Sequence, residues 1–145
     1  RHPAMFKPRL ILGRYLRNDS SLPPRDREIA VLRLAWLTAC DYEWGHHSRI
    51  ATDAGMTPDE IHRVAVRPDA AGWSPFEKTL IAAVDQLHTD AWIDDVTWTA
   101  LSANYSIEQS MDLVFTIGGY KMLAMLINSL GVQLEQGIEG LPFAQ

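Results

Sequence analysis

Cysteine is nearly absent from this chain of 145 residues, and its scarcity excludes one class of protein. The sequence contains a single cysteine, Cys40, so no disulfide can form within the chain. Small secreted domains that depend on disulfides are thereby excluded. We expect a reducing environment, which for this chain means a cytoplasmic location.

Long apolar runs and an excess of basic charge are also missing. No uninterrupted apolar run reaches the roughly 18 residues that a membrane-spanning helix needs, and no signal-peptide pattern follows Arg1. The 13 Lys and Arg residues face 18 Asp and Glu residues, which gives a formal net charge of -5. An acidic chain has no electrostatic reason to bind nucleic acid or an anionic membrane. We expect neither as a partner.

What is present is the composition of an ordinary globular domain. Hydrophobic residues make up 47% of the chain and charged residues 21%, which are common values for folded domains. A chain of this length can bury one core. We therefore expect residues 1–145 to form a single domain.

Helix-start and helix-stop signals predict an all-α fold of six or seven helices, and no segment alternates as a strand would. An irregular arm, residues 1–13, is expected to lead into a short helix around Leu10 to Leu16. Further starts are expected at Pro24 or Arg25, at the capping boxes that begin with Thr57 and Ser74, at Asp94 or Asp95, and at Ser106. Residues 67–72 should separate two of these helices.

The last helix is expected to run from Ile107 to Leu130 and to end at Gly131. It is apolar on almost every side, which predicts burial on most faces. Another subunit is expected to supply part of that burial. Gly118 and Gly119 lower helix propensity and would suit a close backbone approach or a bend.

The segment from Cys40 to His47 carries the residues best suited to chemistry. Cys40, Glu43 and His47 are spaced i, i+3 and i+7, so they share one helical face. Glu43 and His47 can hydrogen-bond as an i, i+4 pair. A carboxylate bonded to one imidazole nitrogen fixes the tautomer and raises the basicity of the other nitrogen.

Glu28 lies twelve residues before Cys40, which is about 18 Å on one straight helix. If the chain folds back near Ala39 to Asp41 as a helical hairpin, Glu28 faces His47. Asp41 would then cap the second helix. Cys40 would lie at that helix N-terminus, where a thiolate is favoured.

Each of these residues also has a purely structural interpretation. His47 would be a buried histidine with satisfied hydrogen bonds, and Cys40 a small buried apolar residue. Glu28 would only pair with Arg25 or Arg33.

The aromatic residues Trp36, Tyr42 and Trp44 are expected to form walls of the core or of a pocket. Glu43 and His47 have the spacing of metal ligands, but no third ligand is evident. We therefore predict no metal site and no cofactor.

The run from Arg27 to Trp36, followed by Cys40 to His47, resembles the signature of the carboxymuconolactone decarboxylase family. The resemblance continues through the helix start at Thr57 and, more weakly, into the last helix. It implies a fold of the alkylhydroperoxidase D type. It also implies a homo-oligomer, a trimer or a hexamer.

The alkylhydroperoxidase D group within this resemblance uses a Glu, a Cys-x-x-Cys pair and a His as redox site and proton relay. The resemblance places that Glu at Glu28, the first Cys at Cys40 and the His at His47. Glu43 stands where the second Cys would be. Reduction of a peroxide through an intrachain disulfide therefore cannot operate.

Three functions follow as hypotheses. The first is a cofactor-free decarboxylase or related lyase that acts on a small carboxylated lactone or ring compound. In it His47 is the general acid or base, Glu43 or Glu28 orients it, Cys40 lines the site, and Arg33 holds a substrate carboxylate. The alternatives are a single-cysteine, thiol-dependent hydroperoxide reductase and a non-catalytic oligomeric binding protein.

Overall fold

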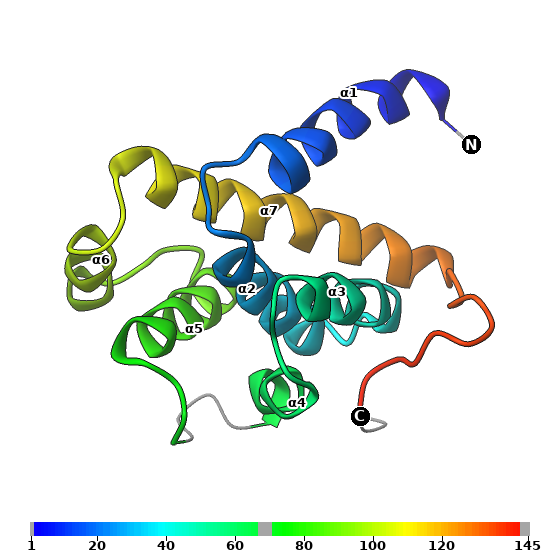
Figure 1. The fold of residues 1–145 in the computed structure, drawn as a ribbon. Helices are drawn as coiled ribbons and strands as arrows, with labels where there is room; N and C mark the ends of the chain where they lie inside the picture. The colour runs from blue at the N-terminus through cyan, green and yellow to red at the C-terminus, as the bar shows by residue number, and fades with distance from the viewer. Residues whose placement is uncertain (1, 67–70, 143–145) are drawn as a thin grey trace.

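The structure is a computed structural model that describes residues 2–66 and 71–142, and it is all-α (Figure 1). No strand occurs in these two ranges, which confirms the predicted fold class. The described residues form seven α-helices and one π-helical turn: α1 (Pro3–Arg14), η1 (Tyr15–Asp19), α2 (Pro24–Leu37), α3 (Asp41–Asp53), α4 (Pro58–Val66), α5 (Pro75–Thr89), α6 (Asp95–Ser102) and α7 (Ile107–Leu130).

Helix α2 is the centre of the fold. Every residue from Arg27 to Ala35 is buried, because α2 packs against α3, α4, α5 and α7. A helix surrounded in this way must bury its polar residues as well as its apolar ones. The charged residues of α2 therefore need partners inside the protein.

Local capping sequences begin the outer helices where the sequence predicts them. Ser74 and Ser106 each form a complete capping box, with Glu77 and Gln109 respectively. The Asp94 side chain accepts from Thr97 N and caps α6. Gly131 ends α7 in the left-handed conformation, with φ 62°. The predicted break at residues 67–72 lies largely outside the described residues.

The N-terminal prediction is wrong, because residues 3–14 form a helix and not an irregular arm. His2 Nδ1 accepts a hydrogen bond from Met5 N at 3.3 Å and caps the helix. Pro3 occupies the first turn, where the missing N–H costs nothing. Pro8 lies inside the helix and removes only one backbone bond, the one to Ala4.

The long helix α7 crosses the molecule beneath α1 in the view of Figure 1. By length and mean hydropathy alone it could span a membrane. Uninterrupted apolar runs, the criterion behind the sequence expectation, do not identify this helix as a candidate. Length and hydropathy are weak evidence, because buried core helices have the same properties, and α7 buries Asp112 and Thr116 on its inner side. Leu16 packs over Gly119, where a Cβ would lie 2.7 Å from Leu16 Cδ1.

Candidate active site

The chain reverses direction between α2 and α3 without the help of a glycine. Ala39 adopts the left-handed conformation with φ 49°, and Cys40 N donates to Ala35 O at 2.9 Å. This is the hydrogen bond of a Schellman-type helix end. A non-glycine residue in this conformation costs about 1 kcal/mol. The turn produces the predicted helical hairpin and places Glu28 opposite His47.

His47 lies between two buried carboxylates. Its Nδ1 is 2.6 Å from Glu28 Oε2 and its Nε2 is 3.4 Å from Glu43 Oε2. Because an ionised carboxylate only accepts hydrogen bonds, Nδ1 is the donor toward Glu28. The second nitrogen, Nε2, then faces Glu43 and is the one that can exchange a proton. We call these three residues the His47 cluster.

Glu28 is held on its other side by its neighbour Arg27. Arg27 Nε donates to Glu28 Oε1 at 2.9 Å, and the Glu28 side chain is completely buried. Glu28 therefore pairs with neither Arg25 nor Arg33. A carboxylate fixed at both oxygens holds the imidazole in one orientation.

The second carboxyl group of the cluster is Glu43, whose pKa is shifted. Burial raises its pKa, and the positive charges of His47, Arg9 and His46 oppose that rise. Glu43 consequently keeps its proton to a higher pH than a glutamate in water. A carboxyl group and an imidazole at this distance can pass a proton between them.

Cys40 is buried away from solvent, against Ala124 and Ile127 of α7. Burial raises the pKa of its thiol, although backbone N–H groups at the start of α3 favour the thiolate. The expectation of a favoured thiolate is therefore wrong. The prediction that Asp41 caps α3 is also wrong, because Cys40 is the N-cap residue and Asp41 Oδ1 accepts from Leu141 N at 2.9 Å.

Tyr42 points away from the His47 cluster and contacts the C-terminal tail. Its ring packs on His46, with the ring centroids 4.4 Å apart. Its Oη lies 3.5 Å from Glu135 Oε1, and His46 Nε2 lies 3.0 Å from Glu135 Oε2. Tyr42 therefore helps to hold the C-terminal tail against α3.

Arg33 holds helices together, which corrects its predicted role. Its Nε and Nη2 donate to the two carboxylate oxygens of Asp85 at 2.7 and 3.0 Å. Its Nη1 donates to the carbonyl oxygens of Val64 and Ala65 at the end of α4. These contacts use four of the five N–H groups of the guanidinium, so no pair of donors is left to hold the two oxygens of a substrate carboxylate.

Trp36 and Trp44 belong to the core, as one of the two sequence interpretations has it. Their rings meet edge to face, with centroids 6.4 Å apart. Trp44 belongs to the main hydrophobic cluster, and the partly buried Trp36 packs against that cluster.

Tyr120 on α7 is a site residue that the sequence reasoning missed. Its ring stands edge-on to the His47 ring, with centroids 4.9 Å apart and planes at 89°. Burial, reinforced by Glu28 and Glu43, raises the pKa of Tyr120 to about 12, so its hydroxyl stays protonated. The helical spacing from Leu113 and Ile117 could have placed Tyr120 on the buried face.

A narrow gap beside Glu43 and Tyr120 is too small to admit a water molecule. Apolar residues and Thr38 complete its lining: Val31, Leu34, Ala35 and Ala124. Substrate binding therefore has to widen this space. Over the described ranges, no group of three or more His, Cys, Asp or Glu side chains is arranged to hold a metal ion.

Three solved structures share this fold. A protein of unknown function from Agrobacterium tumefaciens, named as a candidate antioxidant defence protein AhpD, superposes with a TM-score of 0.84 at 20% identity over 92% of each chain. An uncharacterized peroxidase-related protein from Ralstonia eutropha, with an alkylhydroperoxidase AhpD core, gives 0.80 at 19% identity over 92% of this chain and 72% of its own. An uncharacterized peroxidase-related protein from a Silicibacter species superposes with a TM-score of 0.80 at 12% identity. The match covers 91% of this chain and 71% of the Silicibacter chain.

These likenesses define the class of protein as all-α with the AhpD-like fold, and at such identities they show the fold alone. Residues 3–86, more than half of the chain, match the Carboxymuconolactone decarboxylase family. The chain therefore belongs to that family. The match begins in α1, earlier than the run from Arg27 that carries the resemblance in the sequence. No protein of curated function matches the chain.

Proposed function

We propose that this chain is an acid–base enzyme, a cofactor-free decarboxylase or related lyase for a small carboxylated lactone or ring compound. The observation that carries the proposal is His47, held between two buried carboxylates at 2.6 and 3.4 Å. A histidine with one fixed nitrogen and one nitrogen facing a proton-holding carboxyl group is equipped for general acid–base catalysis.

The chemistry needs three things from the protein. When the bond between the substrate carbon and its carboxylate breaks, CO2 leaves and the electron pair moves into a conjugated carbonyl. The resulting oxyanion needs a hydrogen-bond donor, which the protonated hydroxyl of Tyr120 supplies. A proton must then reach the carbon, and His47 Nε2 delivers it. Glu43 passes its proton to His47 and afterwards takes up one proton from the solvent, so that each turnover consumes one proton.

The test compares single variants acting on a carboxylated unsaturated lactone, with loss of CO2 as the readout. His47→Ala should lower kcat/KM by at least about 100-fold, because general acid–base groups contribute 10²–10⁴-fold. Glu43→Gln should fall between this variant and Cys40→Ser, which should stay within about tenfold of the wild type. His62→Ala, on the exposed face of α4, is the matched control. Equal and small effects of the substitutions at His47, Glu43 and Cys40 would contradict the proposal.

A second candidate, the single-cysteine hydroperoxide reductase, is favoured by the names of the solved relatives. Two of them are called peroxidase-related and one a candidate antioxidant defence protein, which supports this function better than decarboxylation. In it the Cys40 thiolate attacks the peroxide oxygen, the alcohol leaves, and an external thiol reduces the sulfenic acid. The burial and raised pKa of Cys40 count against it.

The two candidates separate in one assay. Consumption of cumene hydroperoxide with dithiothreitol should be weak in the wild type and little changed in Cys40→Ser. Steady turnover that disappears in Cys40→Ser would establish the second candidate and remove the first. Labelling of Cys40 by a thiol reagent should likewise be slow in the native protein and fast after unfolding.

We also propose that the chain forms a homo-oligomer. The outer side of α7 exposes Phe115, Met125 and Leu126, and α1 exposes Phe6 and Ile11 while burying no residue. Exposed apolar faces of this kind commonly mark interfaces, and two of them on one chain suit a second copy of it. Light scattering at micromolar concentration is the direct test, and a stable monomer would contradict the proposal.

A further inference from the structure

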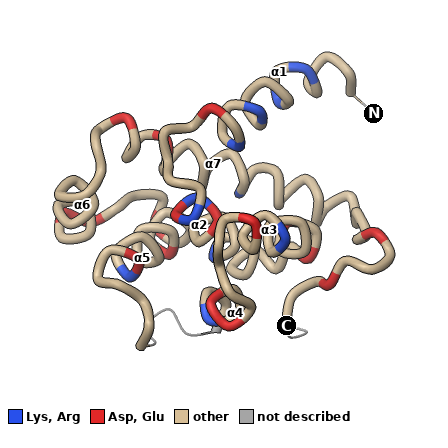
Figure 2. The backbone as a smooth tube through the Cα atoms, in the orientation of Figure 1, with Lys and Arg blue, Asp and Glu red and all other residues tan. Residues whose placement is uncertain are grey.

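The N-terminal segment differs in charge from the rest of the chain. The first 17 residues carry five of the 13 Lys and Arg residues and none of the 18 Asp and Glu residues. Figure 2 shows basic positions along α1, while acidic positions predominate on the other elements. A basic helix attached to an acidic protein favours anions on the side where it lies.

Arg9 on α1 has a side chain that packs along its own helix. Its Nε is buried, yet within the described residues it has no hydrogen-bond partner. Its guanidinium lies against Gly13, one turn further along, where the missing Cβ leaves the room. By contrast, Arg25, Arg27 and Arg33 all bind carboxylates. A buried donor without an acceptor is costly unless a ligand supplies one.

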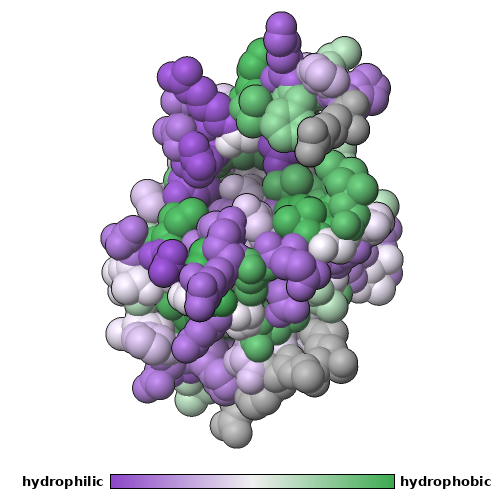
Figure 3. Space-filling model, turned by 90° about the vertical axis from the view of Figure 1, so that its right-hand side faces the viewer, coloured by the Kyte–Doolittle hydropathy of each residue, from purple (hydrophilic) through white to green (hydrophobic). Residues whose placement is uncertain are grey.

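The position of α1 directs Arg9 toward the His47 cluster. Leu16, just after α1, is buried and packs on Gly119, next to Tyr120. Arg9 comes close enough to Glu43 for its charge to lower the pKa of that carboxyl group. Figure 3 shows a hollow beneath the part of the molecule that α1 forms, open to the solvent.

We propose that Arg9 binds the carboxylate of the substrate and so selects anionic ligands for the His47 cluster. This inference rests on the proposed function, and it assigns to Arg9 the role that Arg33 cannot fill. A guanidinium offers Nε–H and Nη–H as a planar fork that matches the two oxygens of a carboxylate. Because the rest of the chain is acidic, an anionic substrate needs such a cation in order to approach Glu43.

The experiment uses 2-furoate, a small carboxylated ring, as the probe, and furfuryl alcohol as its uncharged counterpart. NMR titration of the full chain follows the arginine Nε–H signals and the His47 ring signals. Arg9→Gln should weaken furoate binding at least about tenfold, because the variant loses the charge-assisted hydrogen bonds of the guanidinium. Arg9→Lys should recover part of the affinity, because it keeps the charge without the fork.

Arg14→Gln is the matched control, since Arg14 is on the same helix and exposed. Its Nε lies 4.0 Å from Asp19 Oδ2, so this ion pair is weak. The control variant should change furoate affinity less than twofold, and furfuryl alcohol should bind all variants alike. If furoate shifts the His47 signals with equal affinity in wild type and Arg9→Gln, the role of Arg9 is refuted while the site stands. If furoate shifts neither His47 nor Arg9 in the wild type, both this inference and the proposed substrate class fail.

Discussion

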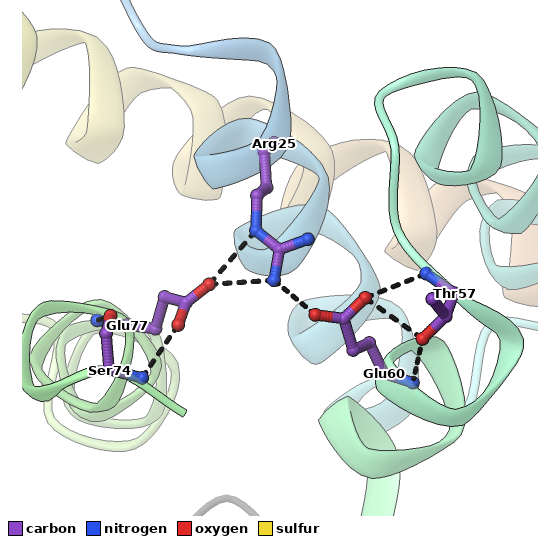
Figure 4. A network of polar contacts seen from close by, with 5 residues as sticks. All are labelled: Arg25, Thr57, Glu60, Ser74 and Glu77. Atoms are coloured by element: carbon purple, nitrogen blue, oxygen red, sulfur yellow. Dashed lines mark hydrogen bonds and ion pairs between the residues drawn. The ribbon is translucent and has the colours of Figure 1, made fainter. Parts of the chain in front are cut away.

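Two clusters of acidic and basic side chains in this protein differ in how they shift the pKa of their carboxyl groups. In the first, which we call the Arg25 network, Arg25 joins Glu60 at 2.6 Å and Glu77 at 2.9 Å (Figure 4). In the second, the His47 cluster, an imidazole joins Glu28 and Glu43. Each cluster therefore contains two carboxylates and one group that can carry positive charge.

The pKa values of the carboxyl groups show the difference. Hydrogen bonds from Arg25 and from Thr57 lower the pKa of Glu60 to about 2, and the pKa of Glu77 is lowered by Ser74 and Arg25 despite burial. Burial instead raises the pKa of Glu43. Glu60 and Glu77 lie at helix N-termini, where free backbone N–H groups stabilise negative charge. Glu43 also lies in the first turn of its helix, α3, but it is buried, and no hydrogen bond contributes to lowering its pKa.

The comparison separates structural ion pairs from groups suited to catalysis. A carboxylate that caps a helix is stabilised in its charged form and serves the fold. A carboxyl group held near a histidine with its charged form disfavoured can give up a proton, which serves chemistry. Three predictions test this distinction.

The largest effect is expected where a buried charge loses its partner. Glu28→Gln should lower the free energy of unfolding by about 3 kcal/mol, because breaking a buried ion pair leaves Arg27 uncompensated. For a chain of this size that corresponds to a fall in Tm of about 10 °C. Chemical denaturation followed by circular dichroism measures it.

A second substitution shows whether the loss comes from the orphaned charge. Arg27→Met added to Glu28→Gln should recover part of the stability, since neither partner is then ionised. Additive losses in the double variant would mean that Arg27 and Glu28 contribute independently, contrary to the geometry.

A smaller effect is expected in the Arg25 network. Arg25→Gln should cost about 1–2 kcal/mol at pH 7, because the pairs are partly exposed and each capping box remains. The pKa of Glu60 is below its ordinary 4.5 in the folded state. Its stabilising contribution is therefore present above pH 4.5 and is lost as the pH falls toward 2.

The difference in stability between wild type and Arg25→Gln should accordingly shrink on acidification. Thermal unfolding between pH 2.5 and 7 measures it, with the exposed Lys78→Gln on α5 as control. A difference that stays constant over this range would show that Arg25 acts by packing alone.

Local features of the fold were predictable from the sequence, because their causes are local. The capping boxes at Thr57 and Ser74 depend on residues three positions apart, and they begin helices where predicted. The common face of Cys40, Glu43 and His47 follows from helical spacing in the same way. Predicting the hairpin required the family resemblance as well. A left-handed turn residue is usually a glycine, but here it is Ala39, so the sequence carries no local sign of the turn.

Features set by distant partners were not predictable. Arg33 looked available until the fold brought Asp85, 52 residues away, against it. The thiol of Cys40 was expected to ionise at a helix N-terminus, yet packing from α7 raises its pKa. Tyr120 had no local signal to link it to His47. In each case a tertiary contact outweighs the local rule.

The last prediction concerns Glu43, the residue on which the comparison depends. Its pKa is raised in the folded state above the ordinary 4.5. The native state then binds more protons than the unfolded state from pH 4.5 upward, so the free energy of unfolding falls as the pH rises through the folded pKa. Glu43→Gln removes that penalty, and at pH 7.5 it should stabilise the protein by about 1 kcal/mol, or about 3 °C in Tm.

The sign of this effect is what distinguishes a proton-holding group from a structural one. Below pH 4.5 the wild-type carboxyl group is neutral in both states, so the gain from Glu43→Gln should vanish there. Thermal unfolding from pH 4 to 8 measures it, with Glu139→Gln in the exposed tail as the control for losing one charge. A variant less stable than wild type at pH 7.5 would mean that Glu43, like Glu60, serves the fold. Gain of stability together with loss of turnover is the result expected of a residue kept for chemistry.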